Sequence, residues 1–252
     1  MFMHFTYLKI NPEYQELLPP FYKNIVLLEL QKIKGCLFGG LVKSSESSAD
    51  YVSVTIWRSR EQAESYEKGE SFARLMDKIK PYLAESSEWK VHLSEDLELN
   101  YDSGLEEPVI REYRVTTQKL ADEEPAPGEN PLYVRLVSVK LQDGKLSEFR
   151  RLYAEEIVPI LQNTNGCRYI YLTESMHGDN EIISITVWDS KRDADEYENS
   201  GQFEELIHKV KHTFSHFYQW KMQLEKEAGN KLKTSDDLKV AYYGMVSGKR
   251  FD

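Results

Sequence analysis

The chain has 252 residues, a length that suits one large domain or two ordinary ones. Its 42 acidic side chains outnumber 32 basic ones, and the net charge of −10 opposes binding to nucleic acid and to anionic membranes. No apolar run approaches the roughly 20 residues that a membrane-spanning helix needs. Two cysteines and the lack of a signal-peptide pattern favour a reduced, cytoplasmic location.

The sequence contains one unit twice, at a constant offset of 131 positions. Gly35-Cys36 recurs as Gly166-Cys167, and no gap is needed to align the rest. Residues 122–132 between the copies are acidic, rich in proline and without an apolar period, which is typical of a linker. We therefore predict a first domain at 1–121, the linker at 122–132 and a second domain at 133–252.

The elements are clearest in the second copy. The run 133–141 is rich in β-branched residues and predicts a strand. From 145 to 161 apolar residues recur three and four apart, which predicts an amphipathic helix that bends at Pro159 and stops before Asn165-Gly166. The runs 167–173 and 181–188 predict a hairpin.

Two shorter helices follow the hairpin. Ser190 is placed to cap a helix over 191–197, and a second helical stretch up to 210 follows the break at 199–201. Further strands are predicted at about 217–224 and at 239–246, and the first copy repeats this pattern. The order β-α-β-β-α-β predicts an α+β fold of two tandem ferredoxin-like units.

The hairpin strands have two distinct faces. In the strand 51–57, Val52, Val54 and Ile56 alternate with Ser53, Thr55 and Trp57, and the second copy repeats this alternation. We expect the aliphatic face to lie under the helices. The Ser/Thr/Trp face is then expected to line a partly open interior between the two sheets, in a barrel that the chain closes with its own second half.

The segment Thr186-Val-Trp188-Asp-Ser190, followed by Ala194, Tyr197 and Phe203-Glu-Glu-Leu206, resembles the antibiotic biosynthesis monooxygenase family of dimeric α+β barrels. Family members usually carry one unit per chain and dimerise. The resemblance therefore implies an internal pseudo-dimer, with further homodimerisation allowed. It also implies a cofactor-independent monooxygenase that uses molecular oxygen as co-substrate on a phenolic, quinol or similar aromatic small molecule in the barrel interior.

The candidate pocket is drawn from aromatic and hydroxyl residues that both copies share. They would form pocket walls and donate hydrogen bonds to a substrate oxyanion. A Trp and a Tyr at equivalent positions are equally typical of a hydrophobic framework, and Glu67 and Glu198 are predicted to be solvated helix residues. The candidates are Trp57, Trp188, Tyr66, Tyr197, Ser53, Thr55, Ser184, Thr186, Phe72 and Phe203.

Three alternatives to this interpretation exist, and two of them depend on other residues of the sequence. The haem-degrading branch of the family has an Asn, a Trp and a His at positions that hold Val137, Tyr197 and Ile207 here, or Thr6, Tyr66 and Met76, so haem is not expected. His208, His212 and His216 have helical spacing, but Pro81 stands at the position equivalent to His212 and predicts that the helix ends there, so no metal site is expected. A non-catalytic small-molecule-binding or stress-related barrel stays open.

Overall fold

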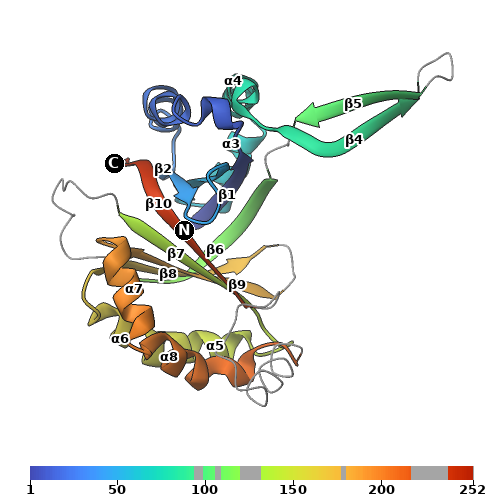
Figure 1. The fold of residues 1–252 in the computed structure, drawn as a ribbon. Helices are drawn as coiled ribbons and strands as arrows, with labels where there is room; N and C mark the ends of the chain where they lie inside the picture. The colour runs from blue at the N-terminus through green and yellow to red at the C-terminus, as the bar shows by residue number, and fades with distance from the viewer. Residues whose placement is uncertain (94–98, 106–108, 120–131, 177–179, 217–237, 252) are drawn as a thin grey trace. The chain divides into compact units, whose positions relative to one another are not determined.

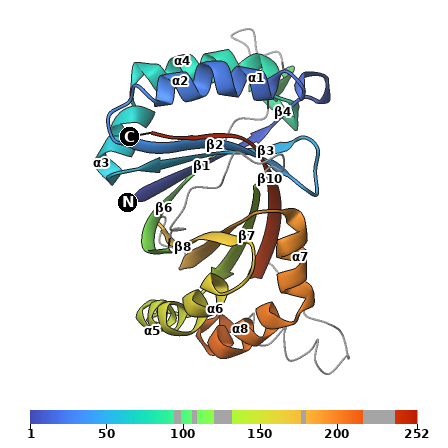
Figure 2. The ribbon, with the colours of Figure 1, turned by 90° about the vertical axis from the view of Figure 1, so that its left-hand side faces the viewer.

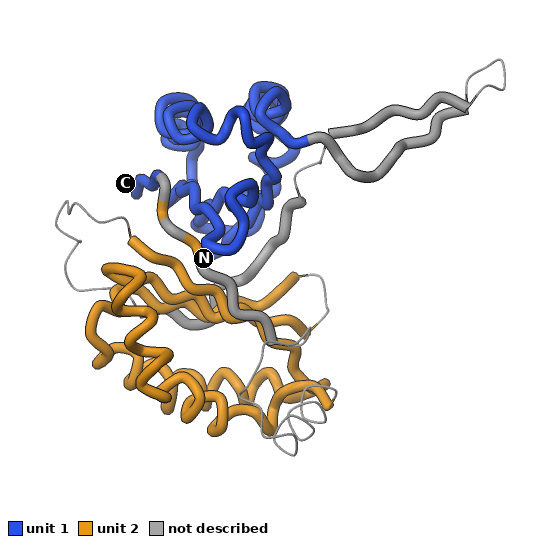
Figure 3. Tube along the Cα trace, viewed as in Figure 1, with its two compact units in different colours: residues 1–111, 246–252 blue, residues 112–245 orange. Residues whose placement is uncertain are grey.

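The structure is a computed structural model that describes all residues except 94–98, 106–108, 120–131, 177–179, 217–237 and 252 (Figure 1). It divides into two compact units, which are drawn in different colours in Figure 3. Unit 1 holds residues 1–111 and 246–252, and unit 2 holds residues 112–245. None of the helices in the described part of the chain has the length and apolar character that crossing a bilayer requires.

Unit 1 is an antiparallel sheet with helices on one face (Figure 2). Its strands β1 (Phe2–Lys9), β3 (Asp50–Trp57) and β2 (Cys36–Ser44) are neighbours in that order. A separate two-stranded sheet pairs β4 (Glu85–Leu93) with β5 (Leu99–Leu105). The helical elements are η1 (Pro12–Tyr14), α1 (Leu18–Phe21), η2 (Tyr22–Val26), α2 (Leu27–Leu30), α3 (Arg60–Glu67), α4 (Glu70–Ile79) and η3 (Lys80–Tyr82).

Unit 2 repeats this plan, and its helices also cover one face of the sheet (Figure 1). The sheet is antiparallel in the order β10-β7-β9-β8-β6. Its strands are β6 (Val109–Lys119), β7 (Tyr133–Lys140), β8 (Cys167–Ser175), β9 (Glu181–Trp188) and β10 (Leu238–Arg250). The helical elements are α5 (Leu146–Leu152), η4 (Tyr153–Ile157), α6 (Val158–Gln162), α7 (Lys191–Asn199), α8 (Gln202–Val210) and η5 (Lys211–Thr213).

Local sequence signals explain where these elements begin and end. Ser190 caps α7 by accepting a hydrogen bond from the Asp193 amide, as predicted, and Ser59 caps α3 in the same way. Gly166 enters β8 at φ 78°, a left-handed conformation that glycine adopts without strain. The structure confirms the predicted helices and the β8–β9 hairpin, and with them the α+β fold of two tandem units.

The last strand of each repeat crosses into the other unit. β6 closes the first repeat, yet it pairs with β8 of unit 2. β10 closes the second repeat and pairs with β7, but its end lies in unit 1, where the Phe251 amide donates to the Leu37 carbonyl at 2.8 Å. The repeats are thus linked by a reciprocal exchange of strand ends. We call this feature the strand exchange.

Some predicted features fall outside what the structure tests. The strand expected at 217–224 and most of the linker at 122–132 lie outside the described residues. In the first copy the equivalent strand starts beside β1, where the Ala84 amide donates to the Lys9 carbonyl at 2.8 Å, and then pairs with β5. The domain boundaries at 121 and 133 and the closure of the two sheets into one barrel stay predictions.

The expected assignment of the two sheet faces is wrong. The Ser/Thr/Trp face lies under the helices, because the hydroxyl of Tyr22 on η2 is 2.8 Å from Ser53 Oγ and the Tyr66 ring of α3 lies 5.0 Å from the Trp57 ring. Unit 2 shows the same arrangement. The polar groups of this face find hydrogen-bond partners among the helix side chains and among themselves, so the layer does not need to be aliphatic.

Candidate functional site

Each unit contains a small cavity between its helices and the Ser/Thr/Trp face of its sheet. Each cavity measures about 40 Å³, which holds a few water molecules. Every residue that lines the unit 1 cavity has its counterpart, 131 positions later, in the lining of the unit 2 cavity. The repeat therefore preserves a complete cavity lining as well as a fold.

A tyrosine held by a π-helical turn contributes a hydroxyl to each cavity. The Leu27 amide bonds to the Tyr22 carbonyl, and the Val158 amide bonds to the Tyr153 carbonyl, which widens the helix by one residue at the same place in both units. The Tyr153 hydroxyl is 2.7 Å from Ser184 Oγ, and that of Tyr22 is 2.8 Å from Ser53 Oγ. Single π-turns inside α-helices often mark functional sites.

Pro159 does not explain the wider turn. The position equivalent to Pro159 in the first copy is Leu28, yet the turn is present there too. What the two turns share is the tyrosine at their first residue.

The two tryptophans stand behind the cavity wall. Trp57 Nε1 donates to Thr55 Oγ1 at 2.8 Å, and Trp188 Nε1 donates to Thr186 Oγ1 at 2.9 Å. Both indoles are fully buried, and neither lines a cavity. Each indole holds a threonine that lines the cavity of its unit, so the two tryptophans have a structural role behind the cavity wall.

The other predicted pocket residues are brought together as cavity lining. They lie between sheet and helices rather than between the two sheets, so the predicted location in a barrel interior is wrong. Positions compared with the haem-degrading branch, such as Met76 and Ile207, also line the cavities. The predicted residues with this placement are Tyr66, Tyr197, Ser53, Thr55, Ser184, Thr186, Phe72 and Phe203.

Burial controls the ionisation of the cavity tyrosines. It raises the pKa of Tyr22 and Tyr153 above the ordinary value of about 10, against the opposing effect of their serine partners. Burial also raises the pKa of Tyr66 and Tyr197. These phenols stay neutral near pH 7, so they can donate hydrogen bonds but do not serve as bases.

One cavity residue of unit 2 carries a charge that the sequence analysis missed. Arg135 on β7 is 2% exposed; its Nη2 donates to Glu198 Oε1 at 2.8 Å, and its guanidinium lies 4.1 Å from the Phe203 ring centre. Glu198 is therefore the partner of a buried arginine, and its prediction as a solvated helix residue is wrong. Its position next to Tyr197, which both copies share as Tyr-Glu, was the available signal.

His4 was missed as well, together with the tyrosines of the π-turns. His4 takes the position of Arg135 in unit 1 and is 4% exposed. A polar residue at an alternating, inward position of a strand is the signal that could have found it. The pair Tyr22 and Tyr153 could have been found through the 131-residue offset itself.

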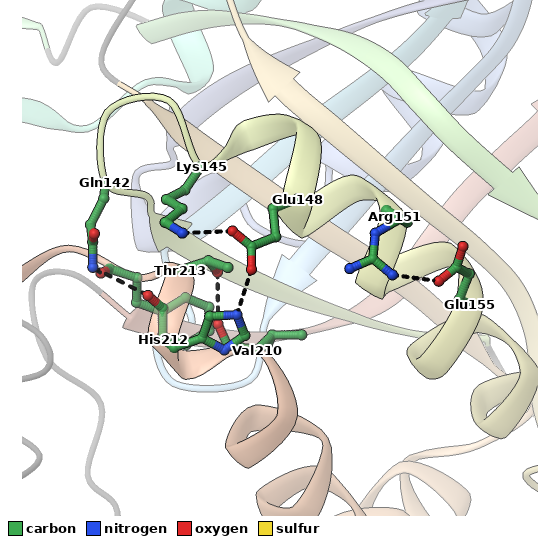
Figure 4. A network of polar contacts seen from close by, with 9 residues as sticks. Gln142, Lys145, Glu148, Arg151, Glu155, Val210, His212 and Thr213 are labelled. Carbon is green, nitrogen blue, oxygen red and sulfur yellow. Dashed lines mark hydrogen bonds and ion pairs between the residues drawn. The ribbon is translucent and has the colours of Figure 1, made fainter.

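Of the three histidines with helical spacing, His212 takes part in a surface network (Figure 4). His212 Nε2 lies 2.9 Å from Glu148 Oε1, and Lys145 Nζ donates to Glu148 Oε2 at 2.6 Å. The helix ends at Val210 before the short turn η5, so His216 does not continue the stripe. In the part of the chain that the structure describes, no three His, Cys, Asp or Glu side chains gather in a way that could hold a metal ion.

A family profile matches both repeats of this chain. The profile described as antibiotic biosynthesis monooxygenase matches residues 1–78 and 132–209. The chain belongs to the antibiotic biosynthesis monooxygenase family. Both matched segments start and end 131 positions apart, so this member of the family carries the family domain twice.

Solved structures share the fold across the whole length. A candidate monooxygenase from Fusobacterium nucleatum superposes with a TM-score of 0.67 at 12% identity, covering 99% of this chain and 94% of the other. A second candidate monooxygenase, from Lactobacillus acidophilus, gives 0.64 at 9% identity with 99% and 95% covered. A protein described as anthrone oxidase-like gives 0.61 at 15% identity with 99% and 92% covered. No protein with a curated description matches the chain in sequence.

Proposed function

We propose that this protein is a cofactor-independent monooxygenase that oxidises a phenolic, quinol or anthrone-like small molecule with molecular oxygen. The observation that carries the proposal is the cavity that both units keep between helices and sheet, with aromatic walls and buried hydroxyl groups. Membership of the monooxygenase family supports it. A cytoplasmic location fits the reduced cysteines and belongs to the same proposal.

The reaction needs no reductant beyond the substrate. A phenol or enol loses a proton to a base, and the electron-rich carbanion that results reacts with oxygen. When a ring CH₂ is oxidised, its two hydrogens leave, one oxygen atom becomes the new carbonyl and the other becomes water. The four electrons that reduce O₂ come from that carbon, so the reaction balances without a further reductant.

The residues of the cavity suit three parts of this reaction. The neutral hydroxyl of Tyr66 can donate a hydrogen bond to the developing oxyanion, and so can that of Tyr22 when it exchanges its bond to the Gly40 carbonyl, 3.1 Å away, for the substrate. Phe72 offers a flat wall for an aromatic ring. Burial keeps water away from the carbanion. A substrate must displace half-buried side chains such as Phe72, because a cavity of about 40 Å³ is far smaller than a ligand site.

Oxygen consumption tests the proposal directly. A panel of quinols and anthrones is offered to the full chain in an oxygen electrode, and the carbonyl product is quantified. We expect one O₂ consumed per product, and a loss of about tenfold to a thousandfold in kcat/KM when Tyr22→Phe removes an oxyanion donor. Tyr14→Phe, on the exposed η1, is the matched control and should keep full activity.

The small volume of the cavities favours a second candidate, a non-catalytic small-molecule-binding or stress-related module. In that case the panel would show no oxygen uptake, while aromatic ligands would still raise the melting temperature. Uptake that is unaffected by Tyr22→Phe, by Tyr66→Phe and by the equivalent Tyr153→Phe and Tyr197→Phe would instead place the reaction outside the two cavities.

A further inference from the structure

The two cavities differ in chemistry at two equivalent positions of their linings. His4 in unit 1 corresponds to Arg135 in unit 2, and Thr6 corresponds to Val137. The remaining equivalent positions keep the same character, with Tyr, Ser, Thr and Phe identical and the aliphatic positions still apolar. Comparing the two repeats therefore shows what a histidine or an arginine does at this position, because the surrounding lining keeps the same character apart from Thr6 and Val137.

This exchange decides which cavity can accept a proton. Among the residues that line the unit 1 cavity, His4 has the side chain whose neutral form accepts a proton near pH 7. The tyrosines there are neutral donors, because burial raises their pKa. Arg135 stays protonated at any relevant pH and is paired with Glu198, so the unit 2 lining offers no comparable base.

The two cavities also differ in how exposed their lining residues are. Four lining positions are half-buried in unit 1 and buried in unit 2. The lining of the unit 1 cavity is therefore the more solvent-exposed of the two at these positions. The pairs are Thr6 and Val137, Val26 and Ile157, Tyr66 and Tyr197, and Met76 and Ile207.

The surroundings of His4 hold its ring in place. His4 lies opposite Thr55 in the β1–β3 register, and its ring packs 5.5 Å from Phe2 and 6.3 Å from Trp57. These contacts limit rotation of a ring that already lines the cavity. A base held in this way meets the geometric requirement for proton abstraction when a substrate hydroxyl comes within hydrogen-bond reach.

We propose that His4 is the general base of this protein and that the unit 1 cavity is the reactive one. An imidazole nitrogen takes the proton of the substrate hydroxyl, and the electron pair of the broken O–H bond stays on the substrate oxygen. The unit 2 cavity performs no acid–base step. This assignment deepens the proposed monooxygenase function and rests on it.

The repeat also supplies a positioning residue for the base. Glu67 on α3 is half-buried and is the counterpart of Glu198, the carboxylate that bonds to Arg135 at 2.8 Å. From this equivalence we infer that the Glu67 carboxylate orients the imidazole and stabilises the imidazolium. The titratable groups that line the cavity with His4 are the phenols of Tyr22 and Tyr66.

A nitrophenol tests the base without requiring turnover. Its phenolate absorbs at longer wavelength than the phenol, so a titration without oxygen, below the probe's own pKa, reports proton transfer on binding. We expect one ionised probe per chain for the wild type. His4→Gln should reduce the ionised fraction at least about tenfold while the probe still binds, and oxygen uptake should fall about 10²–10⁴-fold.

Further variants separate His4 from a general loss of structure. His208→Gln, on the exposed side of α8, is the matched control and should ionise the probe as the wild type does. Free imidazole should restore the phenolate signal of His4→Ala. Glu67→Gln should lower the ionised fraction with little change in probe affinity, a result that a merely structural role would not give.

The outcomes keep the two proposals distinct. Persistence of the phenolate signal in His4→Gln with its loss in Arg135→Gln would overturn the assignment and move the reaction to unit 2. Binding with ionisation that no His4 variant changes would overturn the base and leave the monooxygenase proposal standing. A wild type that binds no phenol at all would overturn both.

Discussion

The two cysteines illustrate how burial at single residues affects stability. Cys36 and Cys167 begin β2 and β8, and burial raises the pKa of each thiol to about 12. A thiol in the unfolded chain ionises near pH 8.5. Between about pH 8.5 and the raised pKa, the unfolded state binds fewer protons than the folded state. The thiols therefore contribute most to stability below about pH 8.5, and the free energy of unfolding falls as the pH rises above that value.

Alkylation measures this protection. We expect iodoacetamide to label both thiols slowly in the native protein at about pH 8 and rapidly after denaturation, since the thiolate is the reactive form. Mass spectrometry of the labelled peptides gives the two rates. Fast labelling of the native protein would contradict the burial of Cys36 and the partial burial of Cys167.

Residues that the copies share could be identified from sequence, and residues that differ could not. The offset pointed to Tyr66 and Tyr197 because both copies carry them. It gave no weight to His4, since its counterpart is an arginine. Strand alternation separated the two faces of the sheet but could not say which one the helices cover, because hydroxyls with nearby partners are as acceptable there as aliphatic groups.

At the scale of elements, the hydroxyl pair at each π-turn allows a test of what stabilises the turn. Tyr153→Phe removes the hydroxyl that meets Ser184 and should lower the free energy of unfolding by about 1 kcal/mol. Urea denaturation of Tyr153→Phe, Ser184→Ala and the double variant measures the coupling between the two groups. A coupling near zero would show that the hydroxyl pair does not stabilise the turn.

Helix and strand bounds followed closely from periodicity, caps and glycines. The helix predicted to stop before Asn165-Gly166 ends at Gln162 in the structure, and both long hairpin strands lie where they were expected. The π-turns and the strand exchange were not predicted. Both depend on contacts between residues far apart in sequence, which local patterns do not encode.

For the whole molecule, the strand exchange predicts that the two repeats stay together after the linker is cut. A protease site placed within 122–132 separates β6 from the second repeat covalently, but β6 remains paired with β8. We expect the cut protein to elute from gel filtration at its original volume with both fragments present, and to separate in denaturant. Dissociation of the fragments under native conditions would contradict the exchange.

The tandem repeat also frees the two cavities from a constraint that binds a dimer of identical chains. In such a dimer every substitution appears in both sites, so neither can change alone. Here position 4 carries a histidine while its counterpart at 135 carries an arginine. One gene can thus keep a reactive centre in one half and let the other drift toward a purely architectural role, so that titration of reactive centres should count one per chain rather than two.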